Sequence, residues 1–389
     1  MTIASTSVTD YGDIVAGLAA ALEERVERSA TTTGVPAATL EDLHQSGLYR
    51  MRVPACLGGG EADARTCYEV VERLSYIDGA TGWTFMAGAN LLGLAGAFLD
   101  DEAVTTILSD PRACIAGQVA ARGKAEATAD GYRVEGTFGF GSGAPHSSYM
   151  MGGFREMRDG EPVRTAMGMP NVLAAVIPRE HVEFLGNWDV LGLQATDSLD
   201  YRIPEQIIDA GFTWPLFTGA PRRGASFYRM GIFGITAIDH SGFSIGVARR
   251  ALDDVAALAV GKRRAGRVTL ADDPIFQSEY AQAEASLRAA RAFVIEAITD
   301  LEQAAAQDAV TQQLRARARL AASHAARTSI EVTGVAYRFS GSTGLRNGSA
   351  MQQCLRDLTA SEAHVFTDHN SWRDTGSALL GTAPADLFL

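Results

Sequence analysis

The stretch 280–301, YAQAEASLRAARAFVIEAITDL, decides the architecture of the C-terminal part of this chain. Its apolar side chains recur at alternating spacings of three and four residues, which is the period of one face of an α-helix. A single helix cannot shield such a stripe from water, so the pattern predicts packing against other helices in a bundle. The stripe consists of Tyr280, Ala283, Leu287, Ala290, Val294, Ala297 and Leu301.

Further helical patterns lie on both sides of this stretch. The next one repeats the stripe with many small residues, which allow helices to approach closely: Leu314, Ala318, Ala321, Ala325, Thr328, Val332, Val335 and Phe339. Near the start of the chain, helices are predicted over about 12–30, 37–48, 64–78, 80–98 and 101–108, separated by Gly and Pro.

The middle of the chain has a different texture. In GYRVEGTFGF, residues 131–140, Tyr132, Val134, Phe138 and Phe140 follow the period of two that is typical of a strand. The order therefore predicts an α+β protein with an N-terminal helical domain over 1–112, a β-barrel or β-sandwich over 113–216 and a C-terminal four-helix bundle over 217–389.

Composition narrows the classes of partner. The 389 residues include 34 Lys and Arg against 46 Asp and Glu, a net charge of −12, which disfavours nucleic acid and anionic membranes as partners. Four widely separated cysteines predict neither a disulfide framework nor a zinc site. With no signal-peptide pattern and no run of eighteen apolar residues, we expect a cytoplasmic protein.

Several common catalytic motifs are missing from the sequence. No Gly-rich dinucleotide fingerprint follows a strand and opens a helix, so no NAD(P)H site is expected. A phosphate-binding loop, a nucleophile elbow and a His-Glu-x-x-His zinc helix are also absent, which excludes the commonest kinases and hydrolases.

Three stretches carry a resemblance to a known family. They are GTFGFGSGAPHSSYMMGG at 136–153, NWDVLGLQATDSLDY at 187–201 and LRDLTASEAHVFTDH at 355–369, with GATGW at 79–83 and IGVARRALDDV at 245–255 in matching order. Together they resemble the acyl-CoA dehydrogenase fold, in the branch of two-component flavin-dependent monooxygenases that hydroxylate aromatic compounds.

The resemblance implies an oxygenase component that receives reduced FMN or FADH₂ from a separate reductase. Such an enzyme uses O₂, through a flavin C4a-hydroperoxide, to hydroxylate an aromatic small molecule, here expected to be polycyclic or heteroaromatic. It also implies a homotetramer. Two alternatives stay open at this point: an FAD-dependent acyl-CoA dehydrogenase or oxidase, and a non-catalytic helical scaffold or ligand carrier.

His364 is the first candidate catalytic residue. The dehydrogenases of this fold carry a carboxylate base where this chain reads His364-Val365-Phe366, whereas the monooxygenases have a His that follows an Arg-Asp pair, here Arg356-Asp357. An imidazole there could hold a positive charge or exchange a proton near neutral pH. On a helix His364 would share a stripe with Asp357, Ser361 and Asp368, although a solvated polar face gives the same pattern.

The resemblance also assigns residues around the flavin. It places the Ser142 hydroxyl at flavin N5 and the Phe140 ring against the flavin, although a serine before Gly143 is also typical of a turn. His146 reads as a surface turn residue. The resemblance also places Gln118, beside Gly117, at the end of a flavin-contacting strand. It places Trp188, Thr196 and Ser198 near the flavin edge, although a buried Trp and capped turn residues would explain these three equally well.

Cations for the flavin phosphate are expected in GKRRAGR, residues 261–267. The resemblance points to Arg263 or Arg267, acting across a subunit boundary, within a cluster that also holds Lys262 and Arg264. A basic helix end that complements the helix dipole is the alternative.

Asn90 marks the substrate side. Several phenol hydroxylases of this branch have a His after the GW helix, but Asn90 cannot deprotonate a phenol. Either the substrate needs no strong base, as an indole or an already acidic polyphenol would not, or another residue such as Asp239 or His240 supplies one. His240 on an apolar helix is also typical of a core histidine.

Overall fold

The N-terminal region is helical, as the sequence predicts. The computed structural model describes residues 9–29, 34–263, 268–346 and 348–384. Aspartates begin two of these helices, because the Asp63 side chain accepts from the Thr66 amide and the Asp78 side chain from the Thr81 amide. The helices are α1 (Tyr11–Ser29), α2 (Ala37–Gln45), α3 (Ala64–Ile77), α4 (Gly79–Phe98) and α5 (Asp101–Leu108).

The middle of the chain forms one eight-stranded mixed sheet. Seven strands follow the order β6-β7-β2-β1-β3-β5-β8, β4 pairs with β3, and only β1 and β3 run parallel. The sequence predicted a β-barrel or β-sandwich in this region, and hydrogen bonds link all the described strands into a single mixed sheet. The strands are β1 (Ile115–Thr128), β2 (Gly131–Gly141), β3 (Tyr149–Arg158), β4 (Glu161–Pro162), β5 (Val172–Pro178), β6 (Glu183–Gly186), β7 (Leu199–Ile208) and β8 (Thr213–Pro215).

The end of β2 departs from the predicted alternation. Phe138 pairs with Tyr201 and Gly141 with Leu199, so β2 has one residue more than β7 over this interval, which is a β-bulge. Phe140 adopts a left-handed φ of 62° and turns outward with 68% of its surface exposed, while Phe138 is buried. Phe140 therefore does not share the face of Phe138, contrary to what the period of two had predicted.

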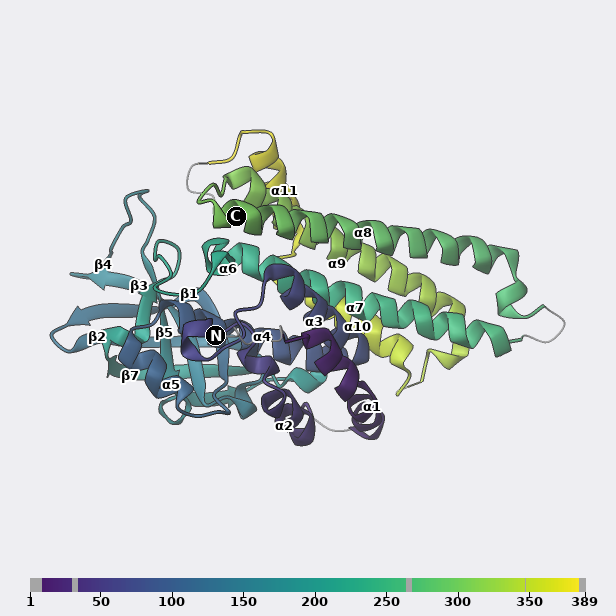
Figure 1. Ribbon diagram of the computed structural model, residues 1–389, viewed down its shortest axis with the longest axis horizontal. Helices are drawn as coiled ribbons and strands as arrows, with labels where there is room; N and C mark the ends of the chain where they lie inside the picture. The colour runs from purple at the N-terminus through teal and green to yellow at the C-terminus, as the bar shows by residue number, and fades with distance from the viewer. Residues whose placement is uncertain (1–8, 30–33, 264–267, 347, 385–389) are drawn as a thin grey trace, which may run out of the picture.

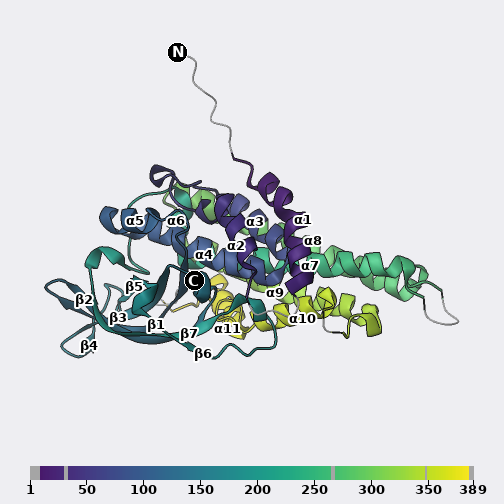
Figure 2. The ribbon, with the colours of Figure 1, turned by 90° about the horizontal axis from the view of Figure 1, so that it is seen from below.

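Long helices form the C-terminal bundle and extend away from the sheet (Figures 1 and 2). The stripe predicted on α8 is buried from Ala283 to Leu301, with α7 and α9 packed against it. None of the helices in the described ranges combines the length and apolar composition that crossing a membrane requires. The helices are α6 (Ser226–Arg229), α7 (Gly231–Gly261), α8 (Pro274–Ala306), α9 (Gln312–Ser340), α10 (Ala350–Ser361) and α11 (His369–Leu379).

Helix α4 is the central element that positions the site. It packs against α3 and α7 on the bundle side and against β1 on the sheet side. Every residue of α4 is buried except Ala87 and Asn90. These two lie four and seven positions after Trp83, so the three side chains share one face of the helix.

Candidate active site

Segments far apart in the sequence meet around Trp83 on α4. Its indole nitrogen donates a hydrogen bond to the hydroxyl oxygen of Ser142, 3.0 Å away and one residue beyond β2. Its ring centroid lies 5.2 Å from that of His240 on α7 and 6.1 Å from that of His364. The two imidazole centroids are 4.3 Å apart. The fold thus brings together three predicted site residues around a Trp to which sequence analysis gave no role, although GATGW belonged to the resemblance.

His364 lies in a turn rather than on a helix. Helix α10 ends at Ser361, so the predicted helical stripe through Asp357 and Asp368 is wrong. Asp357 instead accepts from the Leu193 amide at 2.6 Å, and Asp368 caps α11. The Phe366 amide donates to His364 Nδ1 at 3.2 Å, which assigns the proton of the neutral ring to Nε2.

Arg319 on α9 fixes this turn. Its guanidinium donates to the carbonyl oxygens of Val365 and Phe366, at 3.4 and 3.3 Å, and lies over the rings of Phe366 and Phe233. Sequence reasoning missed Arg319, because its partners lie about 46 residues further along the chain.

Both histidines are neutral near pH 7. Burial lowers the pKa of His240 well below its usual range, and the neighbouring His364 lowers it further. The surrounding protein lowers the pKa of His364 to about 4, opposed by the Asp368 carboxylate. Because His364 is an exposed residue whereas His240 is only 5% exposed, desolvation is the stronger argument for His240. His364 can therefore present an Nε2–H donor, while its cationic form requires an added negative charge.

Behind Ser142 lies a chain of buried hydroxyls. The Ser142 and Ser198 oxygens are 2.8 Å apart, and those of Ser198 and Thr196 are 2.7 Å apart. Thr196 Oγ1 donates to the carbonyl of Leu193 at 2.8 Å. Ser198 and Thr196 are 2% and 1% exposed, so their hydroxyls face Ser142 and the loop rather than the surface.

An aromatic pair, the exposed Phe140 and the partly buried Trp188, flanks this chain. The Phe140 and Trp188 rings meet edge to face with centroids 6.3 Å apart. Gln118 donates to the carbonyl of Gly139 at 2.6 Å and so holds the bulge that turns Phe140 outward. The Trp188 indole nitrogen closes its own loop by donating to the carbonyl of Gln194 at 2.9 Å.

On the substrate side, Asn90 Oδ1 is buried and has no hydrogen-bond partner among the described residues. Asp239 is not available as a base, because it forms a buried ion pair with Arg52, with 3.0 Å between Arg52 Nη1 and Asp239 Oδ2. That alternative from the sequence is therefore wrong.

His146 is half-buried, so it is not the surface residue predicted. Burial lowers the pKa of His146, and the Asp197 carboxylate opposes this shift.

The predicted phosphate cations are not all gathered here. Arg356 on α10 is partly buried, and its Nε has no partner in the described part of the chain. Arg263 is exposed after the far end of α7, and the twenty-one residues from His240 to Gly261 span roughly 30 Å of helix. Lys262 bonds the carbonyl of Ser340 and the hydroxyl of Thr343. Arg264 and Arg267 lie outside the described residues.

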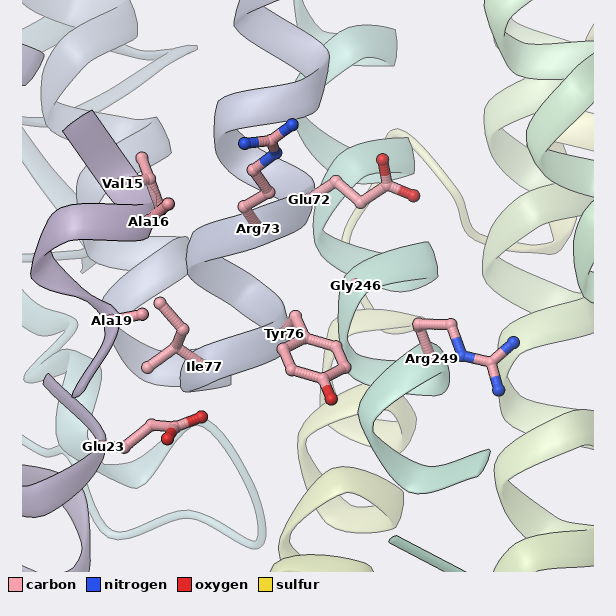
Figure 3. Close-up of a pocket in the computed structure, with 10 residues that line it drawn as sticks. All are labelled: Val15, Ala16, Ala19, Glu23, Glu72, Arg73, Tyr76, Ile77, Gly246 and Arg249. Atoms are coloured by element: carbon pink, nitrogen blue, oxygen red, sulfur yellow. The ribbon is translucent and has the colours of Figure 1, made fainter. Parts of the chain in front are cut away.

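A separate hollow of about 290 Å³ lies between α1, α3 and α7 (Figure 3). Val15, Ile77 and Gly246 are among its lining residues, and it contains none of the predicted site residues. Within the described ranges, no group of three or more His, Cys, Asp or Glu could hold a metal ion.

Two family models match the chain. The acyl-CoA dehydrogenase N-terminal domain matches residues 14–100, and the acyl-CoA dehydrogenase C-terminal domain matches residues 238–369. The chain is 30% identical to the indole-3-acetate monooxygenase of Pseudomonas putida over 88% of its own length and 86% of the relative's. The chain belongs to the flavin-dependent monooxygenases with the acyl-CoA dehydrogenase fold. It is also 26% identical to the oxygenase subunit HsaA of a flavin-dependent monooxygenase from Rhodococcus jostii, over 89% of this chain and 92% of that one.

Solved structures share this fold. The 3-HSA hydroxylase of Rhodococcus sp. RHA1 superposes with a TM-score of 0.87 at 23% identity, over 97% of this chain and 98% of that one. XiaF from Streptomyces sp., solved with FADH2 and glycerol, gives a TM-score of 0.82 at 23% identity, over 98% and 100%. These likenesses in structure agree with the fold that the family models indicate.

The site fits a flavin by its own features. Phe140 is a large aromatic residue held outward in a conformation that side chains rarely adopt, and such strain is characteristic of functional positions. With Trp188 it offers an apolar surface to a flat ring, next to the hydroxyl of Ser142.

Proposed function

We propose that this oxygenase hydroxylates a heteroaromatic or polycyclic small molecule that carries an N–H or O–H group on the ring. When bound, the reduced flavin supplies the two electrons that activate O₂. The observation that carries the proposal is the convergence of Ser142, His240 and His364 on Trp83, beside the Phe140–Trp188 pair.

The residues of the site divide the work. Phe140 and Trp188 bind the flat ring, and Ser142 contacts flavin N5. His364, neutral and held by the Phe366 amide, offers its Nε2–H to a developing negative charge, which lowers the barrier most in a pocket from which water is excluded. Arg356 immediately precedes Asp357, whose carboxylate anchors the Leu193 loop. The Arg356 guanidinium, whose Nε has no partner among the described residues, supplies positive charge near the site.

Asn90 supports the substrate class. Its Oδ1 is a buried acceptor without a partner, and a buried polar atom of this kind is stabilised by a donor on the ligand. Asn90 and Ala87 are also the two positions at which α4 is not buried. An indole N–H would satisfy the amide oxygen, in keeping with the indole-3-acetate named for the Pseudomonas putida relative.

The assembly that we propose is a homotetramer built on the bundle. Large apolar residues are exposed where α7 ends and α8 begins, and Lys262 ties this end to the end of α9. They are Val260, Val268, Ile275 and Leu345. Such a surface is expected to contact another copy. Arg263 at the same end would then reach the flavin phosphate of a neighbouring subunit. We place the enzyme in the cytoplasm, where its four free cysteines stay reduced.

The function is tested with the isolated protein, NADH, reduced flavin and indole-3-acetate as the probe substrate. We expect no NADH oxidation by the protein alone, and O₂ consumption with hydroxylated product when reduced FMN or FADH₂ is supplied. Substantial NADH oxidation without a reductase would contradict the two-component assignment. A monomer in light scattering at micromolar concentration would contradict the tetramer.

A further inference from the structure

The hydroxyl chain behind Ser142 can point in two directions. Each hydroxyl has one hydrogen to donate and two lone pairs to accept with. In the inward direction, Ser142 donates to Ser198, Ser198 to Thr196, and Thr196 to the carbonyl of Leu193. In the outward direction, Thr196 donates to Ser198 and Ser198 to Ser142, so the Ser142 hydrogen is free to leave the chain. If Ser142 and Thr196 both donate to Ser198, the Ser198 hydrogen has no acceptor, which is costly. If Thr196 donates to Leu193 while Ser198 donates to Ser142, no hydrogen lies between the Ser198 and Thr196 oxygens, whose lone pairs then face each other at 2.7 Å.

Two fixed contacts are kept in both directions. The Trp83 indole nitrogen can only donate, so it fills one lone pair of Ser142 in either case. The Leu193 carbonyl also accepts from the Thr196 amide at 3.1 Å, so it keeps a hydrogen bond when the Thr196 hydroxyl turns away. The Asp357 carboxylate holds the Leu193 amide from the other side and so anchors the far end of the chain.

The direction decides what Ser142 offers to a ligand. In the inward direction Ser142 accepts from Trp83, donates to Ser198, and has one lone pair left for a ligand donor. In the outward direction it accepts from both Trp83 and Ser198 and can only donate to a ligand acceptor. The same serine is therefore an acceptor or a donor according to the arrangement of two buried neighbours.

We infer that Ser198 and Thr196 are positioning residues that form a reversible hydrogen-bond relay, which lets Ser142 match the flavin in both redox states. Reduced flavin carries N5–H, a donor, and pairs with the inward direction. Oxidised flavin has a bare N5, an acceptor, and pairs with the outward direction. This inference rests on the proposed function, in which Ser142 faces flavin N5. In the inward direction the Thr196 hydroxyl accepts the Ser198 hydrogen bond, so Thr196 is the residue that supports binding of the reduced flavin.

The test is the ratio of the dissociation constants for oxidised and reduced FMN or FAD, measured by anaerobic equilibrium dialysis of the full chain. Thr196→Val keeps the shape of the buried side chain but removes the hydroxyl that accepts from Ser198, so the Ser198 hydroxyl must donate to Ser142. We expect the ratio of oxidised to reduced dissociation constants to fall about fivefold, as loss of one net hydrogen bond predicts. Ser198→Ala should shift the ratio in the same direction, and Thr196→Ser should leave it unchanged.

Background variants separate the relay from a general packing effect. In Ser142→Ala protein, no hydroxyl links the relay to the flavin, so adding Thr196→Val should no longer change the ratio of oxidised to reduced dissociation constants. If Thr196→Val weakens both redox states equally, or shifts the ratio as strongly in the Ser142→Ala background, the relay is overturned while the flavin site stands. If wild-type protein binds no reduced flavin, the proposed function itself falls, and the relay falls with it.

Discussion

The Trp83 indole N–H donates to the Ser142 hydroxyl over 3.0 Å, while the same indole ring lies edge-on to His240. One side chain of α4 thus fixes a residue of the β region and packs against a residue of the bundle. The geometry of the proposed flavin site therefore depends on the docking of the sheet onto the helices. Substitutions of single residues in this site should show which residues act in the reaction and which only contribute to the free energy of unfolding.

Ser142→Ala should retain binding of reduced flavin but divert O₂ consumption towards free H₂O₂. Loss of one hydrogen bond to a charged or developing-charge group costs about 1.5–3 kcal/mol, or roughly ten- to hundredfold in a rate. The product formed per O₂ consumed is the measurement. Ser147→Ala is the matched control, because the Ser147 hydroxyl donates to the carbonyl of Ala144, within the same turn. Unchanged coupling in Ser142→Ala would make Ser142 a turn residue.

Phe140→Gly should weaken flavin binding without lowering stability. Glycine adopts the φ of 62° freely, so the substitution relieves backbone strain of about 1 kcal/mol while it removes the exposed ring. Phe140→Ala removes the ring but keeps the strain, so the difference between the two variants in free energy of unfolding isolates the backbone contribution. Equal flavin affinity in wild type and both variants would remove Phe140 from the flavin surface.

Asp239→Asn should lower the free energy of unfolding by about 3–5 kcal/mol, because it leaves the fully buried Arg52 guanidinium without its counter-charge. Thermal and urea unfolding measure the loss. The double variant Arg52→Met with Asp239→Leu should recover much of it. If Asp239→Asn instead abolished turnover at unchanged stability, the base role rejected above would return.

The His364 ring should make stability depend on pH. Its pKa falls from 6.5 to about 4 on folding, so the unfolded chain binds the proton more readily. Stability from this group is complete above pH 6.5 and is lost as pH falls towards 4. The size of the loss is limited because the ring keeps accessible surface.

His364→Gln removes that titration. The stability of the variant should decline less steeply than that of wild type between pH 6.5 and 4, in urea unfolding at matched ionic strength. Parallel slopes would show that His364 titrates normally. His364→Ala should slow the reaction of the flavin-loaded enzyme with O₂ at neutral pH, because it removes the Nε2–H donor, whereas the His364→Gln amide retains an N–H donor.

The sequence alone determined the order and type of the elements. The three- and four-residue spacing of Ala283, Leu287 and Ala290 makes a helix with one apolar face, and such a face has to be buried whatever packs on it. The motif order also placed Ser142 and His364 among the site candidates, because residue types that carry chemistry recur at fixed positions along a family's chain.

Only the tertiary structure decided how these residues act. The outward turn of Phe140 depends on a bulge against β7. Whether Asp239 can act as a base depends on its ion pair with Arg52, 187 residues away. The tautomer of His364 depends on a turn that Arg319 holds from another helix. Local periodicity cannot encode such relationships, since each is a contact between segments whose approach is set by the packing of the whole core. The direction of the Ser142 hydroxyl is of the same kind, because it is set by neighbours 54 and 56 residues away rather than by the sequence around it.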